Sequence, residues 1–419
     1  MAVVTFAVGL YVRRATDTPL GAPYPPSLAI LDPMVHPLAV VSVACLLAAV
    51  LLAPRLLDER VRPSAVAGAL LGGTLVLRLA LAAGRQGTGA WDRVFDPARS
   101  FEADNEYLPA LPSLDYGTRF FLDRFAELVP SWPVHVAGHP PGLLLVMHAL
   151  GVTTPGRLAA LCIGVGALSA PLTYGLARGL VGERGGRLAG LLMAVAPGAL
   201  MFGATSADAI YLTLGLLAAW PLVVPSRAAR VGGALLLAVA SLFAWSLLAV
   251  GAWAAIVVLR REGRRPALAL CAVCGVVLLA FHGAFAALTG FDPIGTIQAT
   301  EGVYRAGVAS IRPYWYWVLG SPMGFLVLLG IPIFWLALRE LARGTPEALA
   351  IFAVLAFASL LGFTKAETER IWLFFAPFVC IAAAGALAGR GGQGGRVTAV
   401  LAALALQALL YEHFFDTVW

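Results

Sequence analysis

The fold class is decided by the stretch PLAVVSVACLLAAVLLAP, residues 37–54, in which no side chain is charged. An α-helix of about 20 apolar residues crosses the ~30 Å hydrocarbon core of a membrane. Similar runs recur throughout the 419 residues, which are 60% hydrophobic and 12% charged, with a mean hydropathy of +0.85. This composition excludes a soluble globular protein, and continuous apolar blocks differ from the alternating pattern of membrane β-barrels. We therefore expect an all-α integral membrane protein.

The charged residues lie mostly between the apolar runs. The formal net charge is +6, but the arginines form short clusters between runs, as the positive-inside rule predicts for cytoplasmic loops. We therefore expect membrane lipids, and no nucleic acid, as partners. Abundant Ala, Gly, Val and Arg beside a single lysine are typical of a GC-rich bacterial genome, so the expected location is a bacterial cytoplasmic membrane. Cys271 and Cys274 have the spacing of a redox or zinc pair, but without a nearby His we expect buried apolar residues.

The arginine clusters also set the expected topology of a single transmembrane domain, residues 1–419. The predicted crossings are the runs 37–54, 64–84, 157–177, 188–203, 209–224, 231–259 (a hairpin bending near 244–246), 266–286, 314–337, 346–362, 371–388 and 397–411. The run 141–152 is too short to cross and is expected to insert partly. This gives about eleven spans, or twelve if the short segment 1–12 is a partial first helix.

All the notable polar segments fall on the expected outer face. They are a long first loop at 85–139 with juxtamembrane helices, a turn at 204–208, a second loop at 287–313 and the segment 363–370. Their common side predicts one shared extracytoplasmic site.

An acidic stretch, FEADNEYLPALPSLDYG at residues 101–117, lies within the first loop. Asp104 or Glu106 there is suited to act as a general base, and the two could equally bind a divalent cation through their oxygens. Tyr107 anchors the stretch at the interface. An ordinary solvated acidic loop is the alternative, and no cofactor is implied with certainty.

Two further motifs carry polar groups at the ends of spans. His135 and His139 precede a rigid Pro140-Pro141 corner, where an imidazole can bind a substrate phosphate or hydroxyl, or cap the following helix. Asp208, in TSADAIY, begins a span either as a structural first-turn residue or as a ligand for a hydroxyl group.

Cations on the outer face run against the positive-inside bias and therefore call for a partner. Lys365 and Arg370, with Glu367 between them, lie in TKAETERIW, and Arg312 lies in RPYWYW. An anionic phosphate is one partner that fits, and pairing with the nearby glutamates is the other.

Four of these motifs, in this order, resemble elements of the GT-C superfamily of membrane glycosyltransferases, in the branch of protein O-mannosyltransferases and aminoarabinose transferases. Asp104-Asn105-Glu106-Tyr107 resembles its acidic element, and His139-Pro140-Pro141-Gly142 resembles its H/K-P-P-L element. TSADAIY is similar to its "PDAL" turn, and residues 365–377 are similar to its late lysine-to-proline element. The likeness covers roughly residues 64–390, with Asn105 and Gly142 as departures from the family pattern.

The resemblance implies a GT-C-like bundle of about 11–12 helices that catalyses an inverting transfer. The donor would be a polyprenyl-phosphate sugar, and the acceptor a hydroxyl of a glycan, lipid or protein on the outer face. Asp104, or else Glu106, would be the base. The resemblance further implies phosphate binding by His139, Lys365, Arg370 and Arg312, and acceptor or sugar binding by His135, Asp208, Tyr107 and Glu367.

Three other functions remain open from the sequence. A lipid or glycolipid transporter or flippase would show inverted repeats and ionisable residues in mid-membrane, and no repeat is evident. A non-catalytic GT-C-like assembly subunit would share the fold without the activity. A membrane acyltransferase would need a His near the bilayer, for which His148 and His282 are the candidates.

Overall fold

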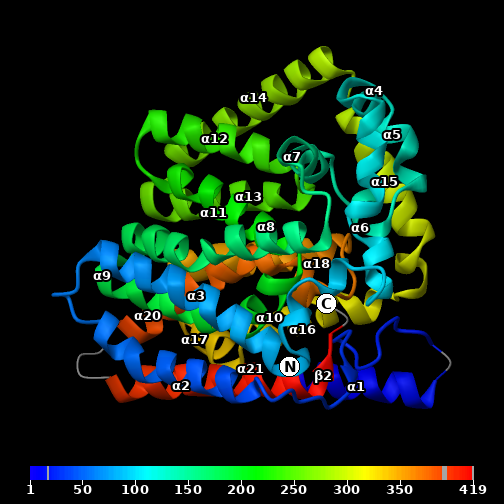
Figure 1. The fold of residues 1–419 in the computed structure, drawn as a ribbon. Coiled ribbons are helices and arrows are strands. Elements are labelled where there is room, and N and C mark those ends of the chain that lie inside the picture. Colours follow the sequence, from blue (N-terminus) through cyan, green and yellow to red (C-terminus); the bar gives the residue numbers. More distant parts are fainter. Residues whose placement is uncertain (17, 389–393, 418–419) are drawn as a thin grey trace. The chain divides into compact units, whose positions relative to one another are not determined.

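A computed structural model describes residues 1–16, 18–388 and 394–417, and these residues are almost entirely helical (Figure 1). Their contacts divide the chain into two compact units. Unit 1 comprises residues 1–91, 162–216 and 312–419, and unit 2 comprises residues 92–161 and 217–311. Two helices, α8 (Pro155–Ala167) and α11 (Asp208–Val223), contribute residues to both units.

Unit 1 is built on long apolar helices. Its elements are α1 (Ala2–Ala15), β1 (Ile30–Leu31), α2 (Ala39–Leu56), α3 (Pro63–Gln86), η1 (Thr88–Trp91), α9 (Ser169–Val195), α10 (Pro197–Thr205), α16 (Tyr314–Leu329), α17 (Ile331–Ala342), α18 (Pro346–Leu361), α19 (Thr368–Ile371), η8 (Leu373–Phe375), α20 (Ala376–Ala388), α21 (Gly394–Phe414) and β2 (Phe415–Asp416). At its centre, α20 packs against α9 and α17. A helix that is apolar on all sides, as α20 is, must be buried.

The N- and C-terminal parts of unit 1 are joined. In Figure 1, α2 and α21 lie side by side, and the two helices are in contact. Strands β1 and β2 pair antiparallel, with Ile30 opposite Asp416. The short sheet therefore links a segment before the first long helix to the end of the last one.

The longest helix, α9, contains a reversal of the chain. Val181 and Gly182 have non-helical backbone angles, and Gly182 has φ +79°. A Cβ atom added to Gly186 would lie 2.9 Å from the backbone of Arg178, and one added to Gly190 would lie 3.0 Å from Cβ of Tyr174. Residues eight apart in a straight helix are separated by about 12 Å. The two halves of α9 therefore run antiparallel in close contact, as small residues permit, which confirms the expected turn at the basic cluster.

Unit 2 combines short helices with four longer ones, α12 to α15. Its elements are η2 (Arg93–Phe95), η3 (Phe101–Asn105), η4 (Leu108–Tyr116), α4 (Thr118–Asp123), α5 (Phe125–Leu128), η5 (Val129–Ser131), α6 (Val134–Ala137), α7 (Gly142–Leu150), α12 (Arg227–Ser241), η6 (Trp245–Leu247), α13 (Leu248–Glu262), α14 (Arg264–Thr289), α15 (Pro293–Ala306) and η7 (Val308–Ile311). Helix α14 packs on α12 and α13. Its other face is apolar and exposed, and it includes Leu279 and Cys271, so the prediction of a buried Cys271 is wrong.

Among the described residues, five helical segments are long and apolar enough to cross a membrane, or seven if two sharply bent helix pairs each form one span. The five are Ala39–Leu56, Pro63–Gln86, Pro155–Val195, Arg264–Thr289 and Gly395–Phe414. Pro155–Val195 includes the reversal of α9 at Gly182. These helices support a multi-pass membrane protein. The number is lower than the eleven or twelve spans expected, because several predicted crossings form helices shorter than the ~20 residues that span a bilayer.

Proline and glycine explain where the predicted runs break. The run 314–337 was predicted as one crossing, but α16 and α17 meet at a 115° bend at Gly330, which has φ +140° and is followed by Pro332. The run 188–203 is likewise divided at Pro197, which begins α10. A proline inside a helix removes one backbone hydrogen bond and clashes with the preceding turn.

Other predicted breaks are confirmed. The hairpin expected in 231–259 bends between α12 and α13, with the short η6 at the turn. The run 141–152, which was predicted to be too short to cross, forms α7, of only nine residues. The turn expected at 204–208 separates α10 from α11 with a bend of 114°.

Candidate functional site

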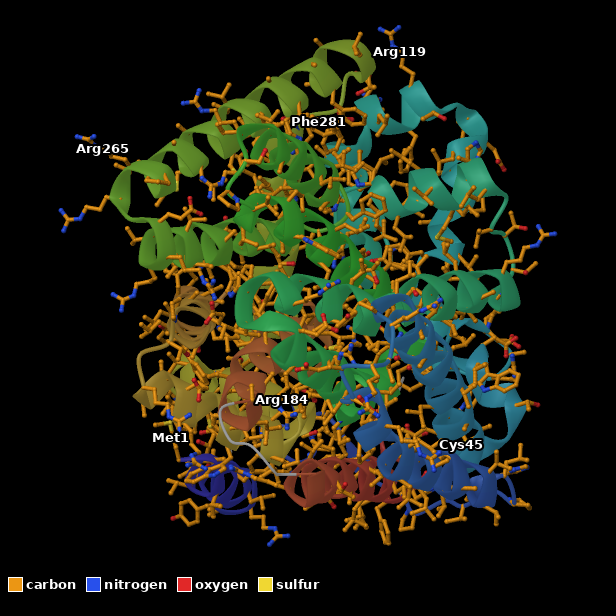
Figure 2. All side chains as sticks on the ribbon, turned by 90° about the vertical axis from the view of Figure 1, so that its left-hand side faces the viewer. Met1, Cys45, Arg119, Arg184, Arg265 and Phe281 are labelled. Atoms are coloured by element: carbon orange, nitrogen blue, oxygen red, sulfur yellow. The ribbon has the colours of Figure 1, made fainter. Side chains whose placement is uncertain are left out.

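Two of the polar segments meet at one end of α14 in unit 2. Helix α15 packs against α5 and η5, and the rings of Phe125 and Phe291 are 6.0 Å apart. Gly290, which follows α14, approaches Asp123 of α4. Figure 2 shows Arg265 and Arg119 pointing away from the ribbon; Arg265 lies at the start of α14, whereas Arg119 lies on α4 near its end. Parts of the first loop (85–139) and the second loop (287–313) therefore lie together at one end of α14, and the arginines that begin this helix, Arg264 and Arg265, lie at its other end.

The acidic stretch contains a buried carboxylate paired with a histidine. Glu106 lies between η3 and η4 with extended backbone and is 1% exposed. Its Oε1 is 3.0 Å from Nδ1 of His135 on α6, which is also buried. Among the described residues, none makes a hydrogen bond to the buried Oε2 of Glu106. One carboxylate oxygen is thus fixed, and the other is left to accept a proton or a hydrogen bond.

A second histidine lies next to this pair. His139 Nδ1 is 2.7 Å from the carbonyl oxygen of His135 and 3.2 Å from the hydroxyl of Tyr107. Because a carbonyl can only accept, Nδ1 of His139 carries a proton and donates to it. The Tyr107 ring lies 6.4 Å from the His135 ring and 6.3 Å from the His139 ring. The four residues form one cluster, which we call the Glu106 cluster.

Asp104 has different surroundings from Glu106. Its side chain is exposed, on η3, whose first turn is capped by Ser100. Within the described part of the chain, no group of three or more His, Cys, Asp or Glu side chains could hold a metal ion. The divalent cation considered for Asp104 and Glu106 therefore lacks further ligands of these types among those residues.

A second cluster, in unit 1, is a chain of alternating charges. Asp208 Oδ2 is 2.6 Å from Nη1 of Arg370, and Arg370 Nη2 is 3.5 Å from Oε2 of Glu367. The other oxygen of Glu367 is 2.8 Å from Nη2 of Arg312. We call these four residues the Arg370 network. Arg370, Asp208 and Arg312 are buried, so solvent screens their interactions weakly.

The polypeptide around Glu367 is held in an unusual conformation. Ala366 and Glu367 both have left-handed backbone angles, with φ of 62° and 57°. Such angles are rare outside glycine and cluster at functional sites. Arg312 Nη1 donates to the carbonyl of Lys365 at 2.7 Å, and the Thr368 hydroxyl donates to the carbonyl of Ser321 at 2.7 Å. These bonds hold the turn that places Glu367 between two arginines.

Glu369 binds an N-terminal segment that sequence reasoning did not connect with this site. Its Oε1 accepts the backbone N–H of Leu28 at 2.9 Å, and burial raises the pKa of its carboxyl group. Arg312 donates to the carbonyl of Gly21, and the Trp317 indole donates to that of Leu20 at 3.1 Å. A positive φ at Gly21 is the local feature that lets the segment approach Arg312.

The predicted site residues thus fall into two groups. Glu106, Tyr107, His135 and His139 share the Glu106 cluster, while Asp208, Arg312, Glu367 and Arg370 form the Arg370 network next to half-buried Lys365. The pairing of arginines with carboxylates is the alternative that the sequence left open for the outer cations. The two histidines considered for acyl transfer lie elsewhere: His148 is exposed at the end of α7, and His282 is 2.8 Å from the hydroxyl of Ser241.

No protein-family model matches the chain, and no curated protein matches it.

Proposed function

We propose that the protein is an inverting glycosyltransferase, which moves a sugar from a polyprenyl-phosphate donor to an acceptor hydroxyl on the outer face of the membrane. The observation that carries the proposal is the fixed, buried carboxylate of Glu106. It is bound through Oε1 to His135, and no hydrogen bond from a described residue reaches its Oε2. The membrane-spanning helices support a lipid-linked donor, because its chain is soluble only among apolar surfaces.

In this proposal Glu106 of unit 2 is the general base. Its Oε2 takes the proton of the acceptor hydroxyl as that oxygen attacks the anomeric carbon. His135 holds the other oxygen and so fixes the direction of the free one. His139 and Tyr107, whose Nδ1 and hydroxyl oxygen are 3.2 Å apart, belong to the same cluster, and the proposal assigns contacts with the acceptor or sugar to them. Asp104, exposed to solvent, is the alternative base.

The same proposal assigns the binding of the donor phosphate to the Arg370 network of unit 1. Breaking the bond between sugar and phosphate adds negative charge to the phosphate, which preorganised cations stabilise. Arg370 is held by Asp208 and Glu367, so its guanidinium is oriented before substrate binds. Arg312 and Arg370 lie in the network itself, and Arg312 also donates to the backbone carbonyl of Lys365. Guanidinium groups bind phosphate through charge-assisted hydrogen bonds, so the proposal assigns the binding of the lipid phosphate to them.

The test is transfer of radiolabelled sugar from purified polyprenyl-phosphate sugars to glycan, lipid and peptide acceptors. Glu106→Gln keeps the shape of the side chain but removes the base, so kcat should fall by about 10²–10⁴-fold. Asp115→Asn, at an exposed position in the same stretch, is the matched control and should retain wild-type activity.

The outcomes separate the hypotheses. A fully active Glu106→Gln enzyme with an inactive Asp104→Asn enzyme would transfer the role of base to Asp104. Full activity of both variants would refute the assignment of the base to either Glu106 or Asp104. Movement of the intact donor across vesicle membranes, without sugar transfer to any acceptor, would instead support the transporter hypothesis.

A further inference from the structure

An arginine in the interior of unit 1 belongs to neither cluster. Arg78 lies on α3 and is fully buried. Its Nη2 donates to the hydroxyl of Ser169 at 3.0 Å, and its Nη1 donates to the carbonyl of Gly203 at 3.3 Å. No carboxylate of the described residues lies within 4 Å of the guanidinium. A buried cation without a counter-ion is costly in a membrane helix, and such residues generally mark functional positions.

The surroundings of Arg78 are shaped to admit it. A Cβ atom added to Gly203 would lie 2.4 Å from Cζ of Arg78, and one added to Gly166 would lie 2.6 Å from Nη1. Real Cβ atoms do not approach other atoms so closely, so any other residue at either position would displace the guanidinium. Two glycines on different helices, α8 and α10, thus leave the space that the side chain occupies.

The position of Arg78 relates it to Asp208. Gly203 lies in the last turn of α10, whose carbonyl groups have no partner within the helix and carry the negative end of its dipole. Ala209 lies on the other side of the bend. A Cβ atom added to Gly166, which would be 2.6 Å from Arg78 Nη1, would also be 2.7 Å from the Cβ of Ala209. Arg78 therefore contacts the end of α10 and lies next to the start of α11. Ser206 follows α10 and Asp208 is the first residue of α11, and their side chains are hydrogen-bonded to each other.

We infer that Arg78 is a positioning residue for the Arg370 network: it fixes the bend between α10 and α11 and thereby the direction in which Asp208 meets Arg370. The guanidinium reaches two acceptors in fixed directions and places a positive charge at the C-terminus of α10, which an apolar side chain cannot do. Asp208 in turn holds Arg370 Nη1 at 2.6 Å. Only the expected effect on sugar transfer rests on the proposed function. The role of Arg78 in fixing the bend between α10 and α11 does not depend on it.

The experiment pairs two glycines of α8. Gly166→Ala places a methyl group against Arg78, whereas Gly164→Ala, two residues earlier, meets no atom within 4 Å. Backbone hydrogen exchange of the purified protein should show loss of protection at residues 206–210 in Gly166→Ala and in Arg78→Met, with unit 2 unchanged. Gly164→Ala should match wild type, and Arg78→Lys, which keeps the cation, should be protected better than Arg78→Met.

Kinetics give a second measurement. If transfer is observed, Gly166→Ala should lower kcat by about 100-fold, the effect of a misplacement of about 1 Å, and leave KM for the acceptor unchanged. Inactivity of the wild-type protein would refute the proposed function but leave the exchange experiment decisive. Unchanged protection at 206–210 in both Arg78→Met and Gly166→Ala would overturn the inference, and so would a uniform loss of protection throughout unit 1.

Discussion

Arg187 offers a direct test of how unit 1 is held together. It lies in the second half of α9 and is 1% exposed. Its guanidinium donates to three carbonyl groups of the α2–α3 connection, at 2.9 Å to Leu56, 2.5 Å to Asp58 and 2.8 Å to Val61. Its Nε is 2.6 Å from Glu183. Replacing it by methionine removes all four interactions while keeping an unbranched, apolar side chain.

The expected loss follows from these contacts. Removing one partner of a buried charge pair costs about 3–5 kcal/mol. The lower end applies, because Glu183 keeps an ion pair with Arg178 at 2.6 Å and because Asp58 is exposed, so water can reach part of the loop. We therefore expect Arg187→Met to lower the free energy of unfolding by about 3 kcal/mol.

The assay is reversible unfolding in mixed micelles, followed by tryptophan fluorescence. Arg184→Met is the matched control: it lies three residues earlier, is half-buried and makes no ion pair with any described residue, so its loss should stay within about 0.5 kcal/mol. Equal losses for Arg187→Met and Arg184→Met would refute the assignment of Arg187 as the residue that binds the α2–α3 connection.

Three further predictions concern the hairpin, pH and topology. Gly186→Ala should destabilise the protein by about 1–3 kcal/mol in the same assay, because its methyl group meets the backbone of Arg178, whereas Gly179→Ala meets nothing and should be neutral. Burial raises the pKa of the Glu369 carboxyl group above its usual 4.5, so the folded protein favours the protonated form. The stability of the protein should therefore decline as pH rises from about 4.5 through the raised pKa. Glu369→Gln should remove this part of the decline in melting temperature. In a cysteine-free background, a membrane-impermeant maleimide added to intact cells should label Tyr116→Cys but not Arg227→Cys, both at exposed positions.

Each of these predictions has a result that contradicts it. Equal effects of the two glycine substitutions would exclude close packing of the two halves of α9. Identical pH profiles of wild type and Glu369→Gln would show that this carboxyl group titrates alike in the folded and unfolded states. Labelling of Arg227→Cys alone would invert the predicted topology and place the acidic stretch on the cytoplasmic side.

Local features of the sequence predicted much of the helical layout. The break in 231–259 was predicted from the arginine clusters at both ends of that run, and the short helix before Gly151 from the length of its apolar run. The 115° bend at Gly330 was missed, although Gly330 and Pro332 mark it, because hydropathy alone gives one continuous run. The same property makes averaged hydropathy predict more crossings than the five to seven segments of the described residues that are long and apolar enough to span, because it does not register where a helix ends.

The sequence predicted which residues belong to the candidate site, but not which of them contact each other. Glu106 and Asp104 are equivalent in the sequence, two residues apart, and only the fold makes one buried and the other exposed. Arg370 finds its partner Asp208 162 positions away, and no local pattern specifies such a distant pair. Glu369 and the segment around Leu28 are separated by an even longer stretch of chain.

The sequence by itself determined that this is a helical membrane protein, because hydrophobicity accumulates over consecutive residues and proline and glycine interrupt a helix wherever they stand. It also showed which charged and polar residues are unusual in a chain that is otherwise apolar. Only the tertiary structure decided that Glu106 is bound by His135, that Arg370 is held between two carboxylates, and that Arg78 lies against two glycines. The strengths of hydrogen bonds and ion pairs depend on distance and burial, and both are properties of the folded chain rather than of any segment of it.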